Sequence, residues 1–470
     1  MSKLELIIRN GKIVTPGGER VADLGIADEK IVALGSNLSG GAHFEVNAAG
    51  RHIFPGLIDA HVHFNEPGRT DWEGIETGSR ALAAGGGTVF FDMPLNAHPP
   101  TCDAESFDLK LAAARKNSLT DFAFWGGLVP QNLDRLEELA DCGVIGFKAF
   151  MTDSGIEDFP CVDDQTLRAG MQRAAKLSLP VAVHAESEML TRELAAEKIA
   201  AGKTSISDYL ASRPVAAELE AIRRAIDLAG ETGCALHVVH VSSGAGVALI
   251  AAAKKTGVNV TCETCPHYLV LTEDDLEKLG AVAKCAPPLR SPTMVAKLWE
   301  HLVSGDITTI GSDHSPSPPE MKRDQNFFKV WGGISGGQHT LPLLLTGRGR
   351  GGESQINLDA HSAKDQGRVT SSPALPLIAK LTSFNVAERF RLPKTKGRIE
   401  IGADADLALV DLSQDFSVRA EDLFYRHQQS PYTGRTLTGR VVQTILRGHT
   451  IFKDGKIVSV KKGKLIKPIL

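Results

Sequence analysis

Five apolar runs of this sequence each end in a side chain that can bind a metal ion, and this repetition limits the possible folds more than any other feature. The first run passes Pro55-Gly56 and ends at His61-Val62-His63. Because successive side chains of a strand point to opposite faces, these two histidines point the same way. An HxH pair alone is weak support for a metal site. Four later runs end in the same manner, at Lys148, His184, His240 and Asp313.

Helical stretches separate the predicted strands, and ligands at the carboxyl ends of several strands are how a (β/α)8 barrel builds its site. The sequence therefore predicts an α/β fold with such a barrel over about residues 53–395. The clearest predicted helix runs from Ala216 to Gly230, where apolar residues recur near a helical period. Asp71 and Asp103 are predicted helix starts, because a short carboxylate can accept from free backbone donors there. The predicted strands cover residues 54–60, 87–93, 121–126, 144–149, 181–184, 236–240, 259–263 and 308–313.

The two chain ends predict short strands rather than helices. The segment from Leu4 to Val14 is typical of a hairpin with its turn at Asn10-Gly11, and a second turn is predicted at Asp454-Gly455. Neither end has enough strands to close a core by itself. We expect residues 1–52 and 396–470 to combine into one small β-sandwich beside the barrel.

Composition limits the partners and the compartment. The net charge of −4 gives no general attraction to nucleic acid or to an anionic membrane. No apolar stretch is long enough to span a bilayer, and no N-terminal segment joins a basic region to a long apolar run. The seven cysteines are scattered, and Cys262-Glu-Thr-Cys265 lacks a second CxxC pair, so we expect reduced thiols. A soluble cytoplasmic protein is the expected result.

One stretch does not fit the barrel pattern. Gly347 to Ser372 is polar, glycine-rich and nearly free of aliphatic residues. Such a composition cannot bury enough apolar surface to offset the entropy of ordering the chain. We expect a disordered surface insertion here.

The runs that end in candidate ligands belong to longer motifs. These are PGLIDAHVHFNEPG (55–68), GFKAF (146–150), VHAES (183–187), VHVSS (239–243), CPHYL (265–269), APPLR (286–290) and SDHSP (312–316). With them the chain resembles the cyclic amidohydrolases, the dihydroorotase-like group of the amidohydrolase superfamily, over nearly its whole length. Within that group, FNEPGRTDWEG and FFDMPLN are most similar to the allantoinases. The resemblance also implies the barrel and the small β-sandwich.

The resemblance implies a binuclear metal site around Lys148. A lysine whose pKa is depressed by burial can capture carbon dioxide, and the resulting carbamate (N6-carboxylysine) can bridge two ions. Phe147, Ala149 and Phe150 favour burial of this lysine. Imidazole and carboxylate ligands suit zinc, although cobalt, manganese or iron could occupy the same ligands. The resemblance assigns two divalent ions, one to His61, His63 and Asp313 and the other to His184 and His240.

The same resemblance implies the reaction, which is hydrolysis of the cyclic amide of the small molecule allantoin to allantoate in purine breakdown. A hydroxide held by the metals is the nucleophile, and Asp313 takes up its proton and returns it to the leaving nitrogen. No nucleophilic serine or cysteine is needed, and the sequence has no Gly-x-Ser-x-Gly elbow. A homo-oligomer, a tetramer, is also implied.

Three further residues are candidate substrate contacts by this resemblance: Asn96, Cys285 and Ser315. Dihydroorotases of the group carry an arginine for the substrate carboxylate where this chain has Asn65, which favours a substrate without a ring carboxylate. Ser317 departs from the cysteine of many allantoinases. The alternatives are a hydantoinase or dihydropyrimidinase with the same mechanism, a dihydroorotase, or a scaffold that has lost catalysis.

Three more histidines lie near predicted strand ends. His237 is three residues from His240 and therefore faces the opposite side of its strand, which favours a packed histidine over a metal ligand. For His267 and His314 two interpretations stay open, either a role in orienting the ligands or a purely structural one.

Overall fold

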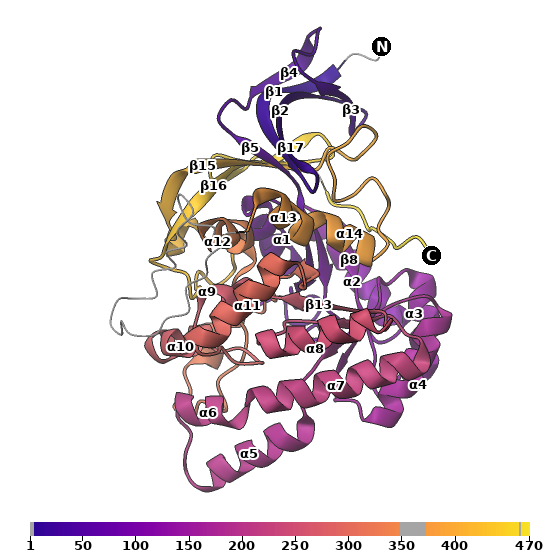
Figure 1. The fold of residues 1–470 in the computed structure, drawn as a ribbon, viewed down its shortest axis with the longest axis vertical. Coiled ribbons are helices and arrows are strands. Elements are labelled where there is room, and N and C mark those ends of the chain that lie inside the picture. The colour runs from indigo at the N-terminus through magenta and orange to yellow at the C-terminus, as the bar shows by residue number, and fades with distance from the viewer. Residues whose placement is uncertain (1–3, 348–372, 460–461) are drawn as a thin grey trace.

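The computed structural model describes residues 4–347, 373–459 and 462–470. All of the predicted insertion except Gly347 lies outside these ranges. Strands alternate with helices through most of the chain, and strands from both chain ends lie together at one end of the molecule (Figure 1). The predicted α/β class is therefore confirmed.

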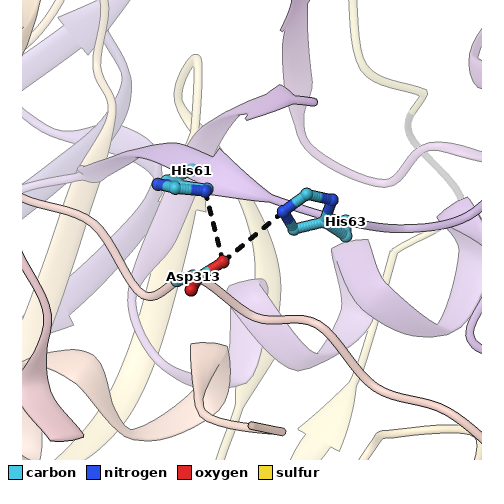
Figure 2. Close-up of side chains that lie close together, drawn as sticks. All are labelled: His61, His63 and Asp313. Atoms are coloured by element: carbon cyan, nitrogen blue, oxygen red, sulfur yellow. Dashed lines mark ion pairs between the residues drawn. The ribbon is translucent and has the colours of Figure 1, made fainter. Parts of the chain in front are cut away.

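Two parallel sheets form the α/β body of the molecule. One has the order β14 (Thr309–Ile310), β13 (Val260–Thr264), β12 (Leu236–Val238), β11 (Val181–His184), β10 (Phe147–Phe150) and β9 (Gly126–Gly127). The other consists of β6 (Leu57–Val62), β7 (Gly87–Asp92) and β8 (Asp121–Phe124). The sheets meet at both edges, because Trp125 alone separates β8 from β9 and Val62 of β6 pairs with His314 after β14. The ends of β6 and β14 therefore come together (Figure 2).

Helices follow the parallel strands along the chain. Their bounds are α1 (Ile75–Ala84), α2 (Ala104–Asn117), α3 (Leu136–Cys142), α4 (Asp164–Lys176), α5 (Glu188–Ala200), α6 (Ile206–Ser212), α7 (Val215–Thr232), α8 (Gly244–Lys255), α9 (Pro266–Val270), α10 (Glu273–Leu279), α11 (Pro292–Ser304), α12 (Thr340–Gly347), α13 (Leu375–Ala379) and α14 (Asn385–Arg389). The predicted helix Ala216 to Gly230 is confirmed as α7, which ends at Gly233 in the left-handed conformation.

The two predicted helix starts have different outcomes. The predicted helix start at Asp103 is confirmed, because its carboxylate accepts a hydrogen bond from the Ser106 amide at the start of α2 (2.8 Å). The predicted helix start at Asp71 is wrong, because α1 begins only at Ile75. The Ile75 amide donates to Glu66 Oε2 (2.8 Å), so a carboxylate more distant in sequence satisfies this helix end.

Strands of both chain ends form one nine-stranded sheet. Its order is β18 (Lys456–Ile457), β17 (His449–Lys453), β16 (Thr436–Leu446), β15 (Leu407–Ser417), β5 (His52–Pro55), β1 (Leu4–Thr15), β2 (Gly18–Ala27) and β3 (Lys30–Gly35), with β4 (Ala42–Asn47) also paired to β1. The chain ends join where β5 pairs antiparallel with β15. Gly56 alone separates β5 from β6, so the first ligand-bearing strand starts directly at this terminal sheet.

The predicted turn at Asn10-Gly11 is wrong, whereas the turn at Asp454-Gly455 is confirmed between β17 and β18. β1 continues through Asn10 and Gly11, and its register against β2 shifts at this point. Asn10 has φ 59°, and its amide donates to Asp23 Oδ1 (2.9 Å). Asn-Gly makes a bulge here instead of a turn, because both geometries favour residues that tolerate positive φ.

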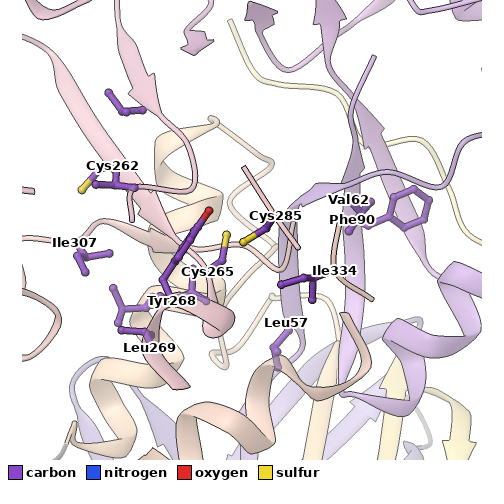
Figure 3. Close-up of a cluster of buried hydrophobic side chains, with 14 of the residues drawn as sticks. Leu57, Val62, Phe90, Cys262, Cys265, Tyr268, Leu269, Cys285, Ile307 and Ile334 are labelled. Carbon is purple, nitrogen blue, oxygen red and sulfur yellow. The ribbon is translucent and has the colours of Figure 1, made fainter. Parts of the chain in front are cut away.

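Buried aliphatic, aromatic and thiol side chains fill the α/β body. Figure 3 draws part of this core, in which Cys262 and Cys265 belong to the same cluster as Tyr268 and Cys285. All seven cysteines are free, as expected. Burial raises the pKa of Cys262 to about 12, so this thiol stays protonated near neutral pH and packs as a small apolar side chain.

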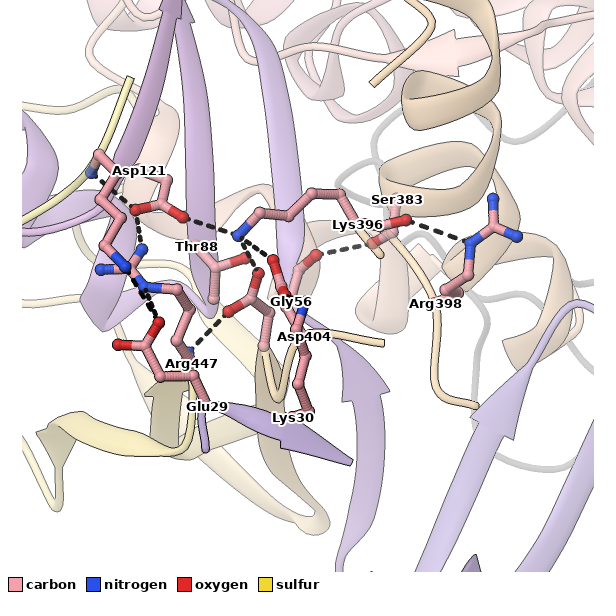
Figure 4. A network of polar contacts seen from close by, with 12 residues as sticks. Glu29, Lys30, Gly56, Thr88, Asp121, Ser383, Lys396, Arg398, Asp404 and Arg447 are labelled. Atoms are coloured by element: carbon pink, nitrogen blue, oxygen red, sulfur yellow. Dashed lines mark hydrogen bonds and ion pairs between the residues drawn. The ribbon is translucent and has the colours of Figure 1, made fainter. Parts of the chain in front are cut away.

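A buried charge network joins the terminal sheet to the α/β body (Figure 4). The Lys396 amine lies 2.7 Å from carboxylate oxygens of Asp121 and Asp406 and 2.9 Å from one of Asp404. Asp121 begins β8, whereas Asp404 and Asp406 precede β15. Arg447, which follows β16, also pairs with Asp121. Acidic groups of both parts therefore share the Lys396 cation, and Asp121 also pairs with Arg447.

Replacing Lys396 with methionine is expected to lower the free energy of unfolding by about 3–5 kcal/mol, because a buried ion pair that loses one partner leaves uncompensated charge. The matched control Lys297→Met removes an exposed lysine that pairs with Glu300 (2.9 Å), and its expected loss is at most about 1 kcal/mol. Denaturant unfolding followed by circular dichroism measures both variants. Equal losses would contradict a role for the buried network.

Candidate metal centre

His61, His63 and Asp313 form a compact cluster at the ends of β6 and β14 (Figure 2). As their spacing predicts, the imidazoles of His61 and His63 lie on the same side of the chain, with ring centroids 5.5 Å apart. Asp313 Oδ1 lies 3.2 Å from His61 Nε2 and 3.4 Å from His63 Nε2. The three ligand atoms all lie within 4.8 Å of one another, so a single ion can reach all three.

Backbone contacts hold these three side chains in register. The Asp59 carboxylate of β6 accepts from the amides of His61 (3.2 Å) and Ser312 (3.0 Å), which ties the end of β6 to the end of β14. The amide of His63 donates to the carbonyl of His314 (2.8 Å). Asp313 has φ 45°, a conformation that non-glycine residues rarely adopt. Such a conformation persists where surrounding contacts impose it, as they do here.

His184 and His240 lie beside this cluster at the ends of β11 and β12. Their ring centroids are 4.6 Å apart, and the His240 ring lies 5.4 Å from that of His61. His184 stacks on Phe150 (4.6 Å, 13°), and its Nε2 bonds to Glu186 Oε2 (2.8 Å), which leaves Nδ1 for another partner. His240 Nδ1 is buried without a hydrogen-bond partner among the described residues.

Lys148 is fully buried in β10, as its apolar neighbours predict. Its amine has no hydrogen-bond partner within the described part of the chain and lies 4.8 Å from the centre of the Phe150 ring. Burial lowers the pKa of Lys148 to about 7, although Asp313 and Glu263 act in the opposite direction. A substantial fraction of the amine is therefore neutral near pH 7, which is the form that reacts with carbon dioxide.

The protonation states of the side chains in the site suit the binding of a cation. Burial lowers the pKa values of His63, His184 and His240, so these rings are neutral and carry a free lone pair near pH 7. Burial by itself would raise the pKa of Asp313, but the neighbouring imidazoles, His61 foremost, hold it well below its usual range. Asp313 is therefore a carboxylate throughout the neutral range.

A cavity of about 340 Å³ opens over these side chains. Its wall contains five predicted metal ligands and three predicted substrate contacts, namely His61, His63, His184, His240, Asp313, Asn96, Cys285 and Ser315. Asn96 Nδ2 lies 3.4 Å from His63 Nδ1 and 3.5 Å from Ser315 Oγ. A separate cavity of about 390 Å³ lies beside β15 and β16, and its wall contains none of these residues.

Glu263 of β13 is a functional candidate that the sequence motifs do not indicate. Its Oε1 lies 2.7 Å from His61 Nδ1, so it fixes the ring with Nε2 towards Asp313. Burial would raise the pKa of Glu263, but contacts with His61 and His237 lower it to about 2. An acidic residue inside the otherwise uncharged strand Val260–Thr264 is the one sequence signal that points to this role.

The remaining histidines lie outside the ligand cluster. His237 Nδ1 bonds to Thr261 Oγ1 (2.8 Å) in the buried core, in line with a packed histidine. His314 Nδ1 accepts from the Gly336 amide (3.2 Å), and the backbone of His314 pairs with β6, so this residue positions the neighbouring Asp313. His267 is buried against Tyr268, and its ring nitrogens have no partner among the described residues.

Comparison with known proteins shows full-length relatives. The model of the amidohydrolase family matches residues 52–458. An allantoinase from Rubrobacter xylanophilus is 54% identical over 468 residues, which cover 100% of this chain and 98% of the relative. An allantoinase from Deinococcus radiodurans is 49% identical over 465 residues, which cover 99% of both chains.

Solved structures of similar fold carry related names. The L-hydantoinase (dihydropyrimidinase) from Arthrobacter aurescens has a TM-score of 0.92 at 33% identity and covers 99% of this chain and 100% of its own. A dihydropyrimidinase from Brevibacillus agri has a TM-score of 0.86 at 30% identity, with coverage of 98% and 99%. This chain therefore belongs to the amidohydrolase family, in the group that contains the proteins named allantoinase.

Proposed function

We propose that this chain is an allantoinase that hydrolyses the ring amide of allantoin to allantoate with two divalent metal ions. The observation that carries the proposal is the convergence of four imidazoles and a carboxylate from four strand ends on one cavity. The buried Lys148 amine lies beside Phe150, which stacks on His184. The relatives named allantoinase are 49–54% identical over the whole chain. Solved structures named hydantoinase or dihydropyrimidinase are 28–33% identical, so allantoin is the favoured substrate and hydantoins or dihydropyrimidines are the alternatives.

The proposed domain division follows the sheets. A (β/α)8 barrel over about residues 53–395 is supported by the two parallel sheets, which meet at both edges. A small β-sandwich from residues 1–52 and 396–470 is supported by the pairing of both chain ends in one sheet. No helix in the described residues is long and apolar enough to cross a membrane. We further propose a cytoplasmic homotetramer, by resemblance to the family.

The donor set fits two divalent ions. The proposed ligands of one ion are His61, His63 and Asp313, whose ligand atoms already lie together. The proposed ligands of the other ion are His184 and His240. Burial lowers the pKa of both rings, so each keeps a nitrogen lone pair free of a proton near pH 7. Lys148, with an unpartnered amine and a pKa of about 7, is the proposed carbamate bridge. Zinc suits this set, with cobalt, manganese and iron as alternatives. When bound, the ions would lower the pKa of a water molecule and polarise the ring carbonyl.

Asp313 is the proposed proton carrier. Asp313 is ionised in the neutral range, so Oδ1 or Oδ2 is free of a proton and can accept one from the attacking water. The same carboxyl group then returns this proton to the ring nitrogen as the amide bond breaks. Glu263 keeps His61 Nε2 directed at Asp313 through the contact at Nδ1, and so holds the carrier in place.

The cavity wall suits a small, uncharged, polar ring. Asn96 and Ser315 present an amide and a hydroxyl 3.5 Å apart. Burial raises the pKa of Cys285 to about 12, so its thiol is neutral at the cavity surface. The wall also contains Arg213, whose guanidinium pairs with Glu186 (2.5 Å). The same wall contains Lys284, whose amine binds backbone carbonyls, and the exposed Lys329. The neutral amide, hydroxyl and thiol of Asn96, Ser315 and Cys285 favour hydrogen bonds to an uncharged ring, and so allantoin over dihydroorotate.

Removal of divalent metal is expected to abolish hydrolysis of allantoin. The side chains of the site alone can hold the substrate and the proton carrier in place. Bound ions are needed to lower the pKa of the attacking water and to polarise the ring carbonyl. Activity and bound metal are measured after chelation and after addition of zinc, cobalt or manganese, and both should return together. Full activity in protein that contains no metal would contradict the proposed function.

A further inference from the structure

One wall of the cavity is a loop, Phe327–Gly333, that contains neither helix nor strand. Six of its seven residues, 328–333, face the cavity. A segment without its own ladder of hydrogen bonds depends on other contacts for a fixed position. Two lysines, the buried Lys284 and the half-buried Lys322, make these contacts.

Lys284 binds the first half of the loop. Its amine donates to the carbonyls of Phe327 (2.6 Å), Phe328 (3.4 Å) and Val330 (2.5 Å). The side chain is 4% exposed, and its amine also lies 4.5 Å from the centre of the Tyr209 ring. Three carbonyl oxygens thus surround one amine at the edge of the cavity.

Lys322 binds the second half of the loop in the same way. Its amine, at the end of the short 3-10 helix Pro319–Lys322, donates to the carbonyls of Trp331 (2.8 Å) and Gly333 (2.8 Å). It also donates to Ala281 (3.1 Å), which precedes Lys284 in the chain. Two backbone bonds complete the attachment, from the Trp331 amide to Met321 and from the Gly333 amide to Lys284.

We infer that Lys284 and Lys322 are positioning residues that hold the loop Phe327–Gly333 as a fixed wall against which the substrate binds. The inference rests on the proposed function for the identity of that substrate. A lysine ammonium has three donors and no acceptor, so it can meet three carbonyls at once, which no neutral side chain of similar length can do. Each of the two lysines does so here.

Two opposing effects act on the protonation of both amines. Burial lowers the pKa of Lys284 and of Lys322 to about 7. Three carbonyl acceptors around each amine favour the ammonium form, because only that form has three protons to donate. Removing the Lys284 amine would take the donor from three loop carbonyls, and removing the Lys322 amine would take it from two, since Ala281 also accepts from the Lys284 amide. The loop would have to move to rehydrate these carbonyls.

A loop that is fixed before binding spares the substrate the entropy of ordering it. Loss of either lysine should therefore weaken substrate binding more than the chemical step, since the metal ligands and Asp313 lie on other segments. The expected signature is a rise in KM with kcat nearly unchanged.

The test compares Lys284→Met and Lys322→Met with Lys329→Met. Methionine keeps the length of the side chain without the donors, and Lys329 is an exposed lysine of the same loop. In the first two variants we expect amide exchange of residues 327–333 to become at least about 10-fold faster, as expected when a loop loses its anchoring bonds. We expect KM to rise at least about 10-fold with bound metal unchanged and kcat within about threefold. Lys329→Met should leave amide exchange within about twofold of the wild-type rate.

Unchanged exchange and KM in both lysine variants would overturn the inference, and so would loss of metal at constant KM. If a variant does not fold, exchange in the wild-type protein can still overturn the inference, because the inference requires a fixed loop. The wild-type Trp331 and Gly333 amides must exchange more slowly than those of an unstructured peptide, and exchange at the peptide rate would overturn the inference. Amide exchange needs no substrate, so it tests the lysines separately from the proposed activity.

Discussion

Lys148→Ala is expected to lose most of its bound metal and to lower kcat/KM for allantoin by ~10³-fold or more, since a bridging ligand serves both ions. The buried amine has no partner in the described part of the protein, and burial keeps its pKa at about 7. A lysine placed in this way can react with carbon dioxide, whereas alanine cannot supply the bridging carboxylate. Metal analysis and steady-state kinetics measure the two losses.

A chemical rescue separates the carbamate from a general effect of the cavity that alanine leaves. Propionate added to Lys148→Ala should occupy the vacated volume and recover part of the metal and of the rate, whereas propionamide, a neutral molecule of similar shape, should not. Labelled bicarbonate should give a carbamate carbon signal in the wild-type protein and none in Lys148→Met. A Lys148→Ala protein that holds two ions and turns over at the wild-type rate would show that the bridge does not exist.

Asp313→Asn is expected to reduce kcat by about 10²–10⁴-fold while keeping much of its metal, because proton transfer by a positioned group contributes a factor of that size. The amide keeps one oxygen near His61 and His63 but cannot accept the proton from water or return it to the ring nitrogen. Steady-state kinetics with metal analysis separate the loss of proton transfer from loss of the site.

The matched control for this variant is Asp306→Asn. Asp306 lies between α11 and β14 and pairs with His301 (2.8 Å) away from the cavity. Its replacement should change kcat by less than about twofold, as for most surface substitutions. If Asp313→Asn retained the wild-type kcat, the proton would have to travel by another group.

The positions of the proposed ligands could be predicted from sequence because they depend on local regularities. An apolar run that ends in His, Lys or Asp predicts a strand and a strand end, and parallel strands align their carboxyl ends. His61, His63 and Asp313 lie together as this reasoning requires. Asp103 and Gly233 follow equally local rules for helix ends.

The errors and omissions involve partners that are distant in sequence. Glu66 lies nine residues before the helix that it caps. The Asn10 amide donates to the Asp23 side chain, at a place where the sequence predicts a hairpin turn. Glu263 acts through His61, about two hundred residues away in the chain. Lys284 and Lys322 bind main-chain carbonyls, which every residue has. No residue type marks such contacts, so only the folded structure reveals them.

Turnover of allantoin, hydantoin, dihydrouracil and dihydroorotate by one metal-loaded preparation tests the central claim most directly. Asn96, Cys285 and Ser315 are neutral groups of the cavity wall, and Arg213 in the same wall is paired with Glu186. We expect kcat/KM for allantoin to exceed that for each other ring by at least ~10²-fold, because a site built for hydrogen bonds to a substrate discriminates strongly against rings that lack the matching groups. Faster hydrolysis of dihydrouracil or dihydroorotate than of allantoin, or no hydrolysis of allantoin with the metal site filled, would contradict the account.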